Sequence, residues 1–166
     1  MGPRARQIVA AARALLEEEG ADALTMRRLA DRLGIKAPSL YKHFPDKAAV
    51  ATQLTAVAFT ELAAALEAAD DDSFPALAAA YRAYALAHPH LYTLSTDRPL
   101  HRDELPPGVE DRAAAPLLRA VDGDADRARA AWAFAHGMVA LELAGRFPPD
   151  ADLDGAWRAG AAAFTP

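Results

Sequence analysis

Residues 36–47, KAPSLYKHFPDK, bring small, hydroxyl, aromatic and basic side chains together in one short stretch. Leu40 and Phe44 lie four residues apart, the spacing of one helical face, so they can anchor a short helix to a core. The residues left to face outward are Lys36, Ala37, Ser39, Tyr41, Lys42 and His43. Small groups permit close approach, polar groups can hydrogen-bond base edges, and lysines can pair with phosphates. The stretch therefore has the chemistry that reading a DNA major groove requires.

A second helix, directly upstream, is expected to hold this stretch in place. Its predicted apolar face consists of four residues at helical spacing, Met26, Leu29, Ala30 and Leu33. Thr25 precedes this face, where its hydroxyl can accept a backbone N–H, and Gly34 follows it, where a left-handed residue commonly ends a helix. Pro38 suits the first turn of the next helix because its missing N–H would have no partner there. Residues 25–47 are therefore predicted to form two helices joined by a tight turn.

The composition predicts an all-α protein, because alanine is abundant and runs of Val, Ile and Thr are scarce among the 166 residues. The absence of cysteine excludes disulfides and thiolate chemistry. The first residues, MGPRAR, lack the apolar core of a signal peptide, and Arg6 stands where a myristoylation site needs Ser or Thr. No apolar run is expected to be long enough to span a bilayer. We therefore expect a soluble cytoplasmic protein without a membrane partner.

Charge is unevenly distributed along the chain. The net charge is −5, which by itself disfavours a nucleic-acid partner. Residues 1–50, however, hold nine Lys or Arg and six Asp or Glu, whereas the remainder holds nine basic and 17 acidic residues. This asymmetry is typical of a basic module that contacts a polyanion joined to an acidic module that does not, although an ordinary solvated surface is the alternative.

The rest of the chain is predicted to form further helices, over residues 47–69, 73–88, 108–121, 124–147 and 153–164. Asp46 and Ser73 stand where they can cap two of them, and a short helix is expected to start near His88. A helix is also predicted before residue 20, with Ile8, Ala11, Ala12, Leu15 and Leu16 on one face, and it ends at Glu17, Glu18 and Glu19. Because acids oppose the dipole at a helix C-terminus, this end is expected to be solvated.

The predicted helix over residues 124–147 is apolar on two faces. One stripe contains Trp132, Ala135, His136, Val139 and Leu143, and the other contains Phe134, Met138, Leu141 and Gly145. A helix of this kind has to be buried on two sides, and in a domain this small we expect one side to meet a partner subunit. The candidates for this dimer interface are Phe134, Met138, Leu141, Gly145 and, from the last helix, Trp157.

With these residues in view, the chain resembles the tetracycline-repressor (TetR) family of bacterial regulators. The resemblance is closest over the first 55 residues, where LTMRRLADRLGIKAPSLYKHFPDKAAV follows a first helix and precedes a long one. It rests on one register of matching residues: Thr25, Leu29, Ala30, Leu33, Gly34, Leu40, Tyr41, Phe44 and Lys47. The second half resembles a C-terminal domain of this family named WHG, through Trp132, His136 and Gly137, with HPHLYTL and LELAGRF in support.

The resemblance implies a fold and a function. The fold would be an N-terminal three-helix helix-turn-helix DNA-binding domain, residues 1–47, and a C-terminal helical effector-binding and dimerisation domain, residues 48–166. The function would be that of a homodimeric transcriptional regulator on a palindromic double-stranded DNA operator, in most members a repressor released by a small molecule. The chain departs from most members in its short N-terminal arm and short length. A small effector cavity, or none, is therefore expected.

The resemblance also implies roles for individual residues. The helix over residues 36–43 would enter the major groove. Tyr41 and Lys47 match positions that contact phosphates, and Thr25 matches a capping position that also does so. The base-reading positions correspond to Ala37, Pro38, Ser39, Lys42 and His43, with Lys36 at the start of the same helix. For Tyr41 a partly buried place in the bundle is the alternative, and for His43 an ordinary surface histidine.

A largely apolar small-molecule effector is expected to bind in the second half of the chain. The residues that could line its pocket are Phe59, Tyr81, Tyr84, Tyr92, Trp132 and His136. The alternative is plain packing: core or interface for Trp132, a satisfied core histidine for His136, and core for the tyrosines.

No catalytic residue, cofactor or metal site is expected. The sequence contains no G-x-S-x-G, no phosphate-binding glycine loop and no H-E-x-x-H. His88 and His90 flank a proline two residues apart, which does not place them on one helical face for a metal. The alternative function is a helical protein–protein interaction module without sequence-specific DNA binding. Salt dependence separates the two, because binding to several phosphates weakens steeply as salt rises.

Overall fold

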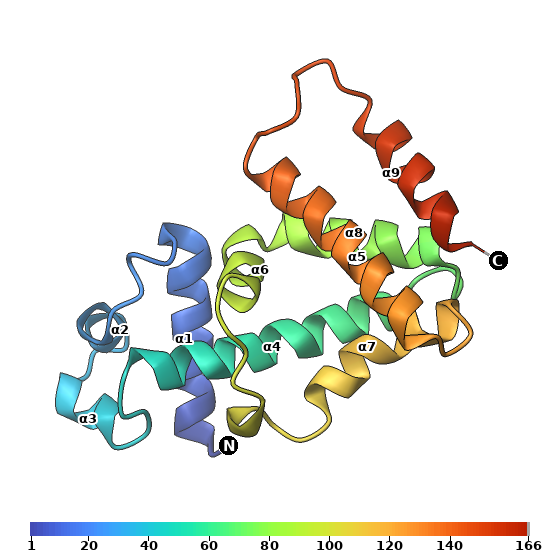
Figure 1. Ribbon diagram of the computed structural model, residues 1–166. Coiled ribbons are helices and arrows are strands. Elements are labelled where there is room, and N and C mark those ends of the chain that lie inside the picture. Colours follow the sequence, from blue (N-terminus) through green and yellow to red (C-terminus); the bar gives the residue numbers. More distant parts are fainter. Residues whose placement is uncertain (166) are drawn as a thin grey trace. The chain divides into compact units, whose positions relative to one another are not determined.

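The structure is a computed structural model that describes residues 1–165. All regular secondary structure in this range is helical (Figure 1). Pro166, the last residue of the predicted effector domain, lies outside the described residues. The elements are α1 (Pro3–Glu19), α2 (Met26–Arg32), α3 (Ala37–Tyr41), α4 (Lys47–Glu67), α5 (Phe74–Ala87), α6 (Pro89–Thr96), η1 (Arg102–Glu104), α7 (Val109–Ala120), α8 (Ala125–Leu143), α9 (Leu153–Ala161) and η2 (Ala162–Phe164). The predicted all-α fold is confirmed.

By packing, the chain forms two compact units. The first unit contains Met1–Ala58 and His88–Pro107, and the second contains Phe59–Ala87 and the residues from Gly108 onward. Helix α6 therefore belongs to the unit of the N-terminal helices, where it contacts α1. Its neighbours in sequence, α5 and α7, belong to the other unit. The functional division between residues 47 and 48 is a different division and stays a prediction.

The first unit has one apolar core. Leu29 of α2, Leu40 of α3 and Leu54 of α4 are at most 1% exposed and meet there. Helix α1 contributes Ile8, Val9, Ala12, Leu15 and Leu16, and α6 contributes Leu91 and Leu94. The predicted anchoring roles of Leu40 and Phe44 are confirmed, since both are buried in this core.

The acidic end of α1 is exposed at Glu18 and Glu19, as expected, and it is also bound by neighbouring elements. The backbone N–H of Leu91 in α6 donates to Glu17 Oε1 at 3.2 Å. Glu18 and Glu19 are exposed, but they are ion-paired with Arg32 and Arg28 of α2. These donors offset the unfavourable placement of acids at a helix C-terminus.

The second unit is built around α5, which contacts α7, α8 and α9. At one end, Phe134 of α8 lies in an aromatic cluster with Phe74, Trp157 and Phe164, with ring centroids 5.6–6.3 Å from its own. At the other, Arg82 of α5 bonds to two carboxylates on α8 and α9. Figure 1 shows α9 returning beside α8 after the intervening loop.

Helix α8 is shorter than predicted. It ends at Leu143 rather than near residue 147, because Gly145 adopts a left-handed conformation with φ +61°. The backbone N–H of Arg146 then donates to the carbonyl of Leu141 at 2.9 Å, which closes the helix end. Gly145 is therefore the residue that stops the helix, and it does not extend an apolar stripe along it.

Helix α4, 21 residues long, is the one described helix that meets the length and composition of a membrane span. This corrects the expectation that no apolar run reaches that length. Within the protein, 44% of its most apolar segment is buried, and Val50, Leu54 and Ala58 lie in the core of the first unit. Helices from the cores of proteins pass the same test of length and composition.

Candidate DNA-binding site

Helix α2 is held in place at both ends, as predicted. The Thr25 hydroxyl accepts the backbone N–H of Arg28 at 3.2 Å, which confirms the N-terminal cap. After the helix, Gly34 has φ +64°, a conformation that side chains with a Cβ rarely adopt. The N–H of Ile35 donates to the carbonyl of Ala30 at 3.0 Å, which closes the turn toward α3. The chain is thereby fixed into two helices with a tight turn between them.

One face of helix α3 packs on the core of the first unit, and the opposite face is exposed. Lys36 is its N-cap and Pro38 lies in its first turn. The Leu40 side chain is fully buried, and Phe44, after the helix, is 6% exposed. The helix ends at Tyr41 rather than at residue 43, because the N–H groups of His43 and Phe44 both turn back to the carbonyl of Leu40. The two apolar anchors fix which residues face outward.

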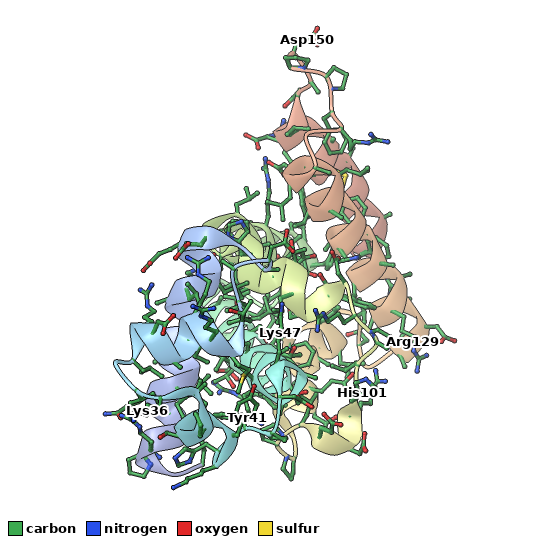
Figure 2. The ribbon with its side chains drawn as sticks, turned by 90° about the vertical axis from the view of Figure 1, so that its left-hand side faces the viewer. Lys36, Tyr41, Lys47, His101, Arg129 and Asp150 are labelled. Carbon is green, nitrogen blue, oxygen red and sulfur yellow. The ribbon has the colours of Figure 1, made fainter. Side chains whose placement is uncertain are left out.

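The predicted DNA-contacting residues share this outward face. Lys36, Pro38, Ser39, Lys42 and His43 are exposed, and Ala37 is half-buried. The Tyr41 side chain is 52% exposed, which agrees with the partly buried alternative and still leaves the side chain accessible to a partner. Figure 2 shows the side chains of Lys36 and Tyr41 at the surface around α3. The arrangement offers two lysines, one hydroxyl group and one phenol to a partner without disturbing the core.

Lys47 is placed differently from the other candidates. It is half-buried at the start of α4, and its Nζ donates to the backbone carbonyl of Ala21 at 3.1 Å. The preceding Asp46 caps α4, as predicted, by accepting the N–H of Ala49 at 2.8 Å. Lys47 therefore ties the start of α4 to the segment before α2 in addition to carrying a positive charge.

Sequence reasoning missed what the arginines of α2 do. Arg32 Nη1 and Nη2 each donate to one oxygen of Glu18 at 2.7 Å, and Arg28 donates to Glu19. The hydrogen bonds that Arg32 donates to Glu18 lower the pKa of the Glu18 carboxyl and raise the pKa of Arg32. The usable signal was the four-residue spacing of Arg28 and Arg32 near a run of three acids.

The effector-pocket candidates are scattered. Tyr92 belongs to the first unit and the other five to the second. Tyr81 and Tyr84 are buried, Phe59 and His136 are half-buried, and Trp132 is 51% exposed. Trp132 stacks on His136 with ring centroids 5.8 Å apart. Only Tyr81 and Trp132, of the candidates, line a common cavity among the described residues.

That cavity is small. It measures about 20 Å³ and is lined by Leu66, Phe74, Leu77, Ala78, Tyr81, Leu117, Trp132 and Ala135. A volume of this size is comparable with the space needed by one water molecule. A larger cleft of about 220 Å³ lies between α5 and α9, lined by Pro75, Ala78, Ala79, Arg82, Asp154, Trp157, Arg158 and Ala161. None of the expected pocket residues lines that cleft.

The dimer-interface candidates divide into covered and open residues. Phe134 and Trp157 pack against each other in one chain, with Trp157 only 7% exposed. Met138 is half-buried, whereas Leu141 is 44% exposed and Gly145 is exposed. No group of three or more His, Asp or Glu within residues 1–165 is arranged to hold a metal ion.

The comparisons with known proteins agree over both halves of the chain. Residues 8–54 match the family described as bacterial regulatory proteins, tetR family, and residues 74–164 match the tetracyclin repressor-like C-terminal domain. The uncharacterized HTH-type transcriptional regulator Rv0681 of Mycobacterium tuberculosis is 34% identical over 151 residues, which is 83% of this chain and 69% of that protein. The chain belongs to the TetR family of bacterial regulators.

Members of this family are DNA-binding transcriptional regulators, and the fold agrees. The tetracycline repressor protein class A from transposon 1721 of Escherichia coli is 44% identical over 54 residues, covering 32% of this chain and 25% of the repressor. A solved structure of a protein from Rhodococcus sp. RHA1 superposes with TM-score 0.77 and 28% identity, covering 99% of this chain and 94% of that one. The matched C-terminal family is not described as WHG, so that finer assignment stays a prediction.

Proposed function

We propose that this TetR-family regulator represses transcription by binding a palindromic operator as a homodimer, with α3 of each copy in the major groove. The observation that carries the proposal is the pairing of a fully buried Leu40 with a 52% exposed Tyr41 on one five-residue helix. A helix that short gains little from its own hydrogen bonds, so its support comes from the core and its outer face is left to a partner. Regulators of this kind act in the cytoplasm, and we propose no enzymatic activity for this one.

The residues proposed to contact DNA fall into two groups. Tyr41, Lys47 and Thr25 serve the phosphates, and Lys36, Ala37, Pro38, Ser39, Lys42 and His43 serve the base edges and the groove wall. Phosphate contacts set orientation, whereas base contacts set sequence preference. The two groups therefore predict different losses: a phosphate contact weakens binding to all sequences, and a base contact relaxes the choice of operator.

The test is footprinting on the DNA that flanks the protein's own gene, followed by gel-shift titration of variants. Tyr41→Phe removes only the phenol oxygen of an exposed side chain, so we expect weaker operator binding with unchanged thermal stability. Ser39→Ala should weaken operator binding while leaving affinity for unrelated DNA unchanged. Lys47→Ala also loses the bond to the Ala21 carbonyl, so its circular dichroism spectrum has to match the native one. Unchanged affinity in Tyr41→Phe would remove the phosphate assignment.

For the homodimer we propose the open face of α8. Leu141 is 44% exposed there, and a Cβ added at Gly137 meets no described heavy atom within 4 Å, so another helix can approach closely. Leu141→Glu is expected to give monomers in light scattering. Phe134→Glu is a poor test because Phe134 packs on Trp157 within one chain. A persistent Leu141→Glu dimer would place the interface elsewhere.

We propose a largely apolar effector that releases the regulator from DNA. The supporting observation is the apolar cavity next to Tyr81 and Trp132, which at about 20 Å³ has to widen before a drug-sized molecule can enter. Because Trp132 is 51% exposed, it can move without opening the core, and effector binding should change tryptophan fluorescence. The alternative, a protein-interaction module, predicts binding to a protein partner that is insensitive to salt and no shift of any flanking DNA.

A further inference from the structure

We infer that Glu18 and Glu19 limit the affinity of the first unit for DNA by withholding two of the three arginines of α2 from the phosphates. The inference rests on the proposed function, and it concerns residues outside the face of α3. It predicts that the two acids set the affinity of the regulator for DNA of any sequence. They thereby also set the ratio of its affinity for the operator to its affinity for other DNA.

The geometry is that of a specific pair of contacts between α1 and α2. Arg32 holds Glu18 through two parallel bonds of 2.7 Å, the arrangement in which a guanidinium fits a carboxylate best. Arg28, one turn earlier on the same face, donates to Glu19. The Arg32 side chain is 33% exposed and that of Glu18 is 56% exposed, so the pair lies at the surface without being buried.

The third arginine of α2 differs. Arg27 is exposed, and among residues 1–165 it forms no ion pair. It is one residue from Arg28, which on a helix places it on another face. Of three positive charges on this helix, one is therefore uncompensated and two are matched by carboxylates of α1.

An ion pair presents almost no net charge to a polyanion. If Arg32 left Glu18 for a phosphate, the Glu18 carboxylate would remain close to the DNA, and its repulsion would cancel much of the gain. A glutamate is already charged at neutral pH, and the bond from Arg32 lowers the pKa of Glu18 further. In helix-turn-helix proteins the first helix of the pair crosses the DNA backbone, so cations on α2 that were released would lie in reach of phosphates.

The experiment compares the salt dependence of binding to a mixed-sequence DNA duplex by fluorescence anisotropy. Each additional neutralised phosphate steepens the slope of log K against log salt by about 0.9. The Glu18→Gln/Glu19→Gln variant is therefore expected to bind more tightly at low salt and to have a slope steeper by about 1.8. Between 50 and 200 mM salt it should lose about tenfold more affinity than the native protein.

Asp22→Asn is the matched control. Asp22 is exposed, lies three residues beyond Glu19, and forms no ion pair among the described residues. It adds the same single charge as Glu18→Gln but releases no arginine, so its slope should equal the native slope. Equal steepening in both single variants would show a general change in the field of the first unit and would overturn the inference.

Arg28→Ala/Arg32→Ala completes the cycle. In the native background these changes should leave the slope nearly unchanged, and in the Glu18→Gln/Glu19→Gln background they should abolish the steepening. A slope flatter by about 1.8 in the native background would show that the arginines already neutralise phosphates, against the inference. Native protein that binds no duplex would overturn the proposed function as well, whereas native binding with identical slopes overturns this inference alone. Circular dichroism melts confirm that each variant is folded.

Discussion

One arginine–carboxylate pair in each unit joins two helices, and the two pairs differ in their exposure to solvent. In the first unit, Arg32 and Glu18 join α1 to α2 at the surface, with side chains 33% and 56% exposed. In the second, Arg82 and Glu142 join α5 to α8 with side chains only 22% and 14% exposed, and Arg82 reaches Asp154 of α9 as well. Arg82 also lies over the Trp157 ring, 5.6 Å from its centroid.

This difference in exposure separates two tasks. An exposed pair contributes little to stability, because water competes for both partners and salt screens them. Its main effect is on the field that an approaching polyanion meets. A shielded pair fixes the positions of helices, because removal of one partner leaves the other with an uncompensated charge. The exposed pairs of α1 and α2 are therefore the ones proposed to control binding, whereas the Arg82 network of the second unit holds three helices together.

The largest predicted effect is the loss of Arg82. Arg82→Met should lower the free energy of unfolding of the second unit by about 2–3 kcal/mol, just below the range for fully buried pairs because the guanidinium keeps some solvent. Both tryptophans, Trp132 and Trp157, belong to this unit, so fluorescence during urea unfolding reports on it. Arg32→Met is the counterpart in the first unit, followed by circular dichroism, and should change stability little. Equal losses of unfolding free energy in the two variants would show that the difference in exposure does not separate the roles of the two pairs.

The next effect tests how tightly α8 and α9 pack in the second unit. A Cβ added at Gly160 would overlap the ring of Phe134, which is packed against Phe74, Trp157 and Phe164 and has little room to move. Gly160→Ala should therefore cost about 1–2 kcal/mol, as overpacking of a core does.

Gly137→Ala is the matched control for Gly160, because a Cβ there meets no described heavy atom within 4 Å. On a helix this change favours folding by about 0.5–1 kcal/mol. The two variants should therefore shift the urea midpoint in opposite directions. Because the proposed dimer sets a second copy against this face of α8, both variants are compared in the monomeric Leu141→Glu background. A Gly137→Ala that lowers the urea midpoint there would contradict the free space beside Gly137.

The helix pair that carries the candidate site was predictable because its signals are local. Thr25, Gly34 and Pro38 act within one or two turns of the backbone, and the spacing of Leu40 and Phe44 decides which face is buried. What depends on distant residues was not predictable. The bond from Leu91 to Glu17, the pair of Arg82 with Glu142 and the packing of Phe134 on Gly160 each join residues on different helices. Hydrophobic spacing predicts that Phe134 is covered, but not which surface covers it.

A smaller effect is expected from the cap of α2 in the first unit. Thr25→Ala removes the oxygen that accepts the N–H of Arg28 and should cost about 1 kcal/mol. Thr25→Ser keeps that oxygen and should cost less. Because this unit has no tryptophan, its unfolding is followed by amide hydrogen exchange of α2 and α3. Faster exchange in the tryptophan-bearing unit would contradict the assignment of the cap to local support.

The smallest effect is the pH dependence that Asp154 contributes. Hydrogen bonding to Arg82 lowers the pKa of the Asp154 carboxyl from its ordinary value of 3.8. A carboxyl whose pKa is lower in the folded than in the unfolded state stabilises the fold above the unfolded pKa, and this stabilisation is lost as the pH falls through the folded pKa. Asp154→Asn should therefore lower the melting temperature slightly at neutral pH and reduce its decline below about pH 4.

Asp150→Asn is the control for this effect. Figure 2 shows Asp150 at the tip of the loop that joins α8 to α9, and among the described residues it forms no ion pair. Its melting curves should follow those of the native protein at every pH. The melting temperature of Asp154→Asn could instead fall in acid as steeply as that of the native protein. Arg82 would then stabilise the second unit through Glu142 alone, and its network would be reduced to a bond between α5 and α8.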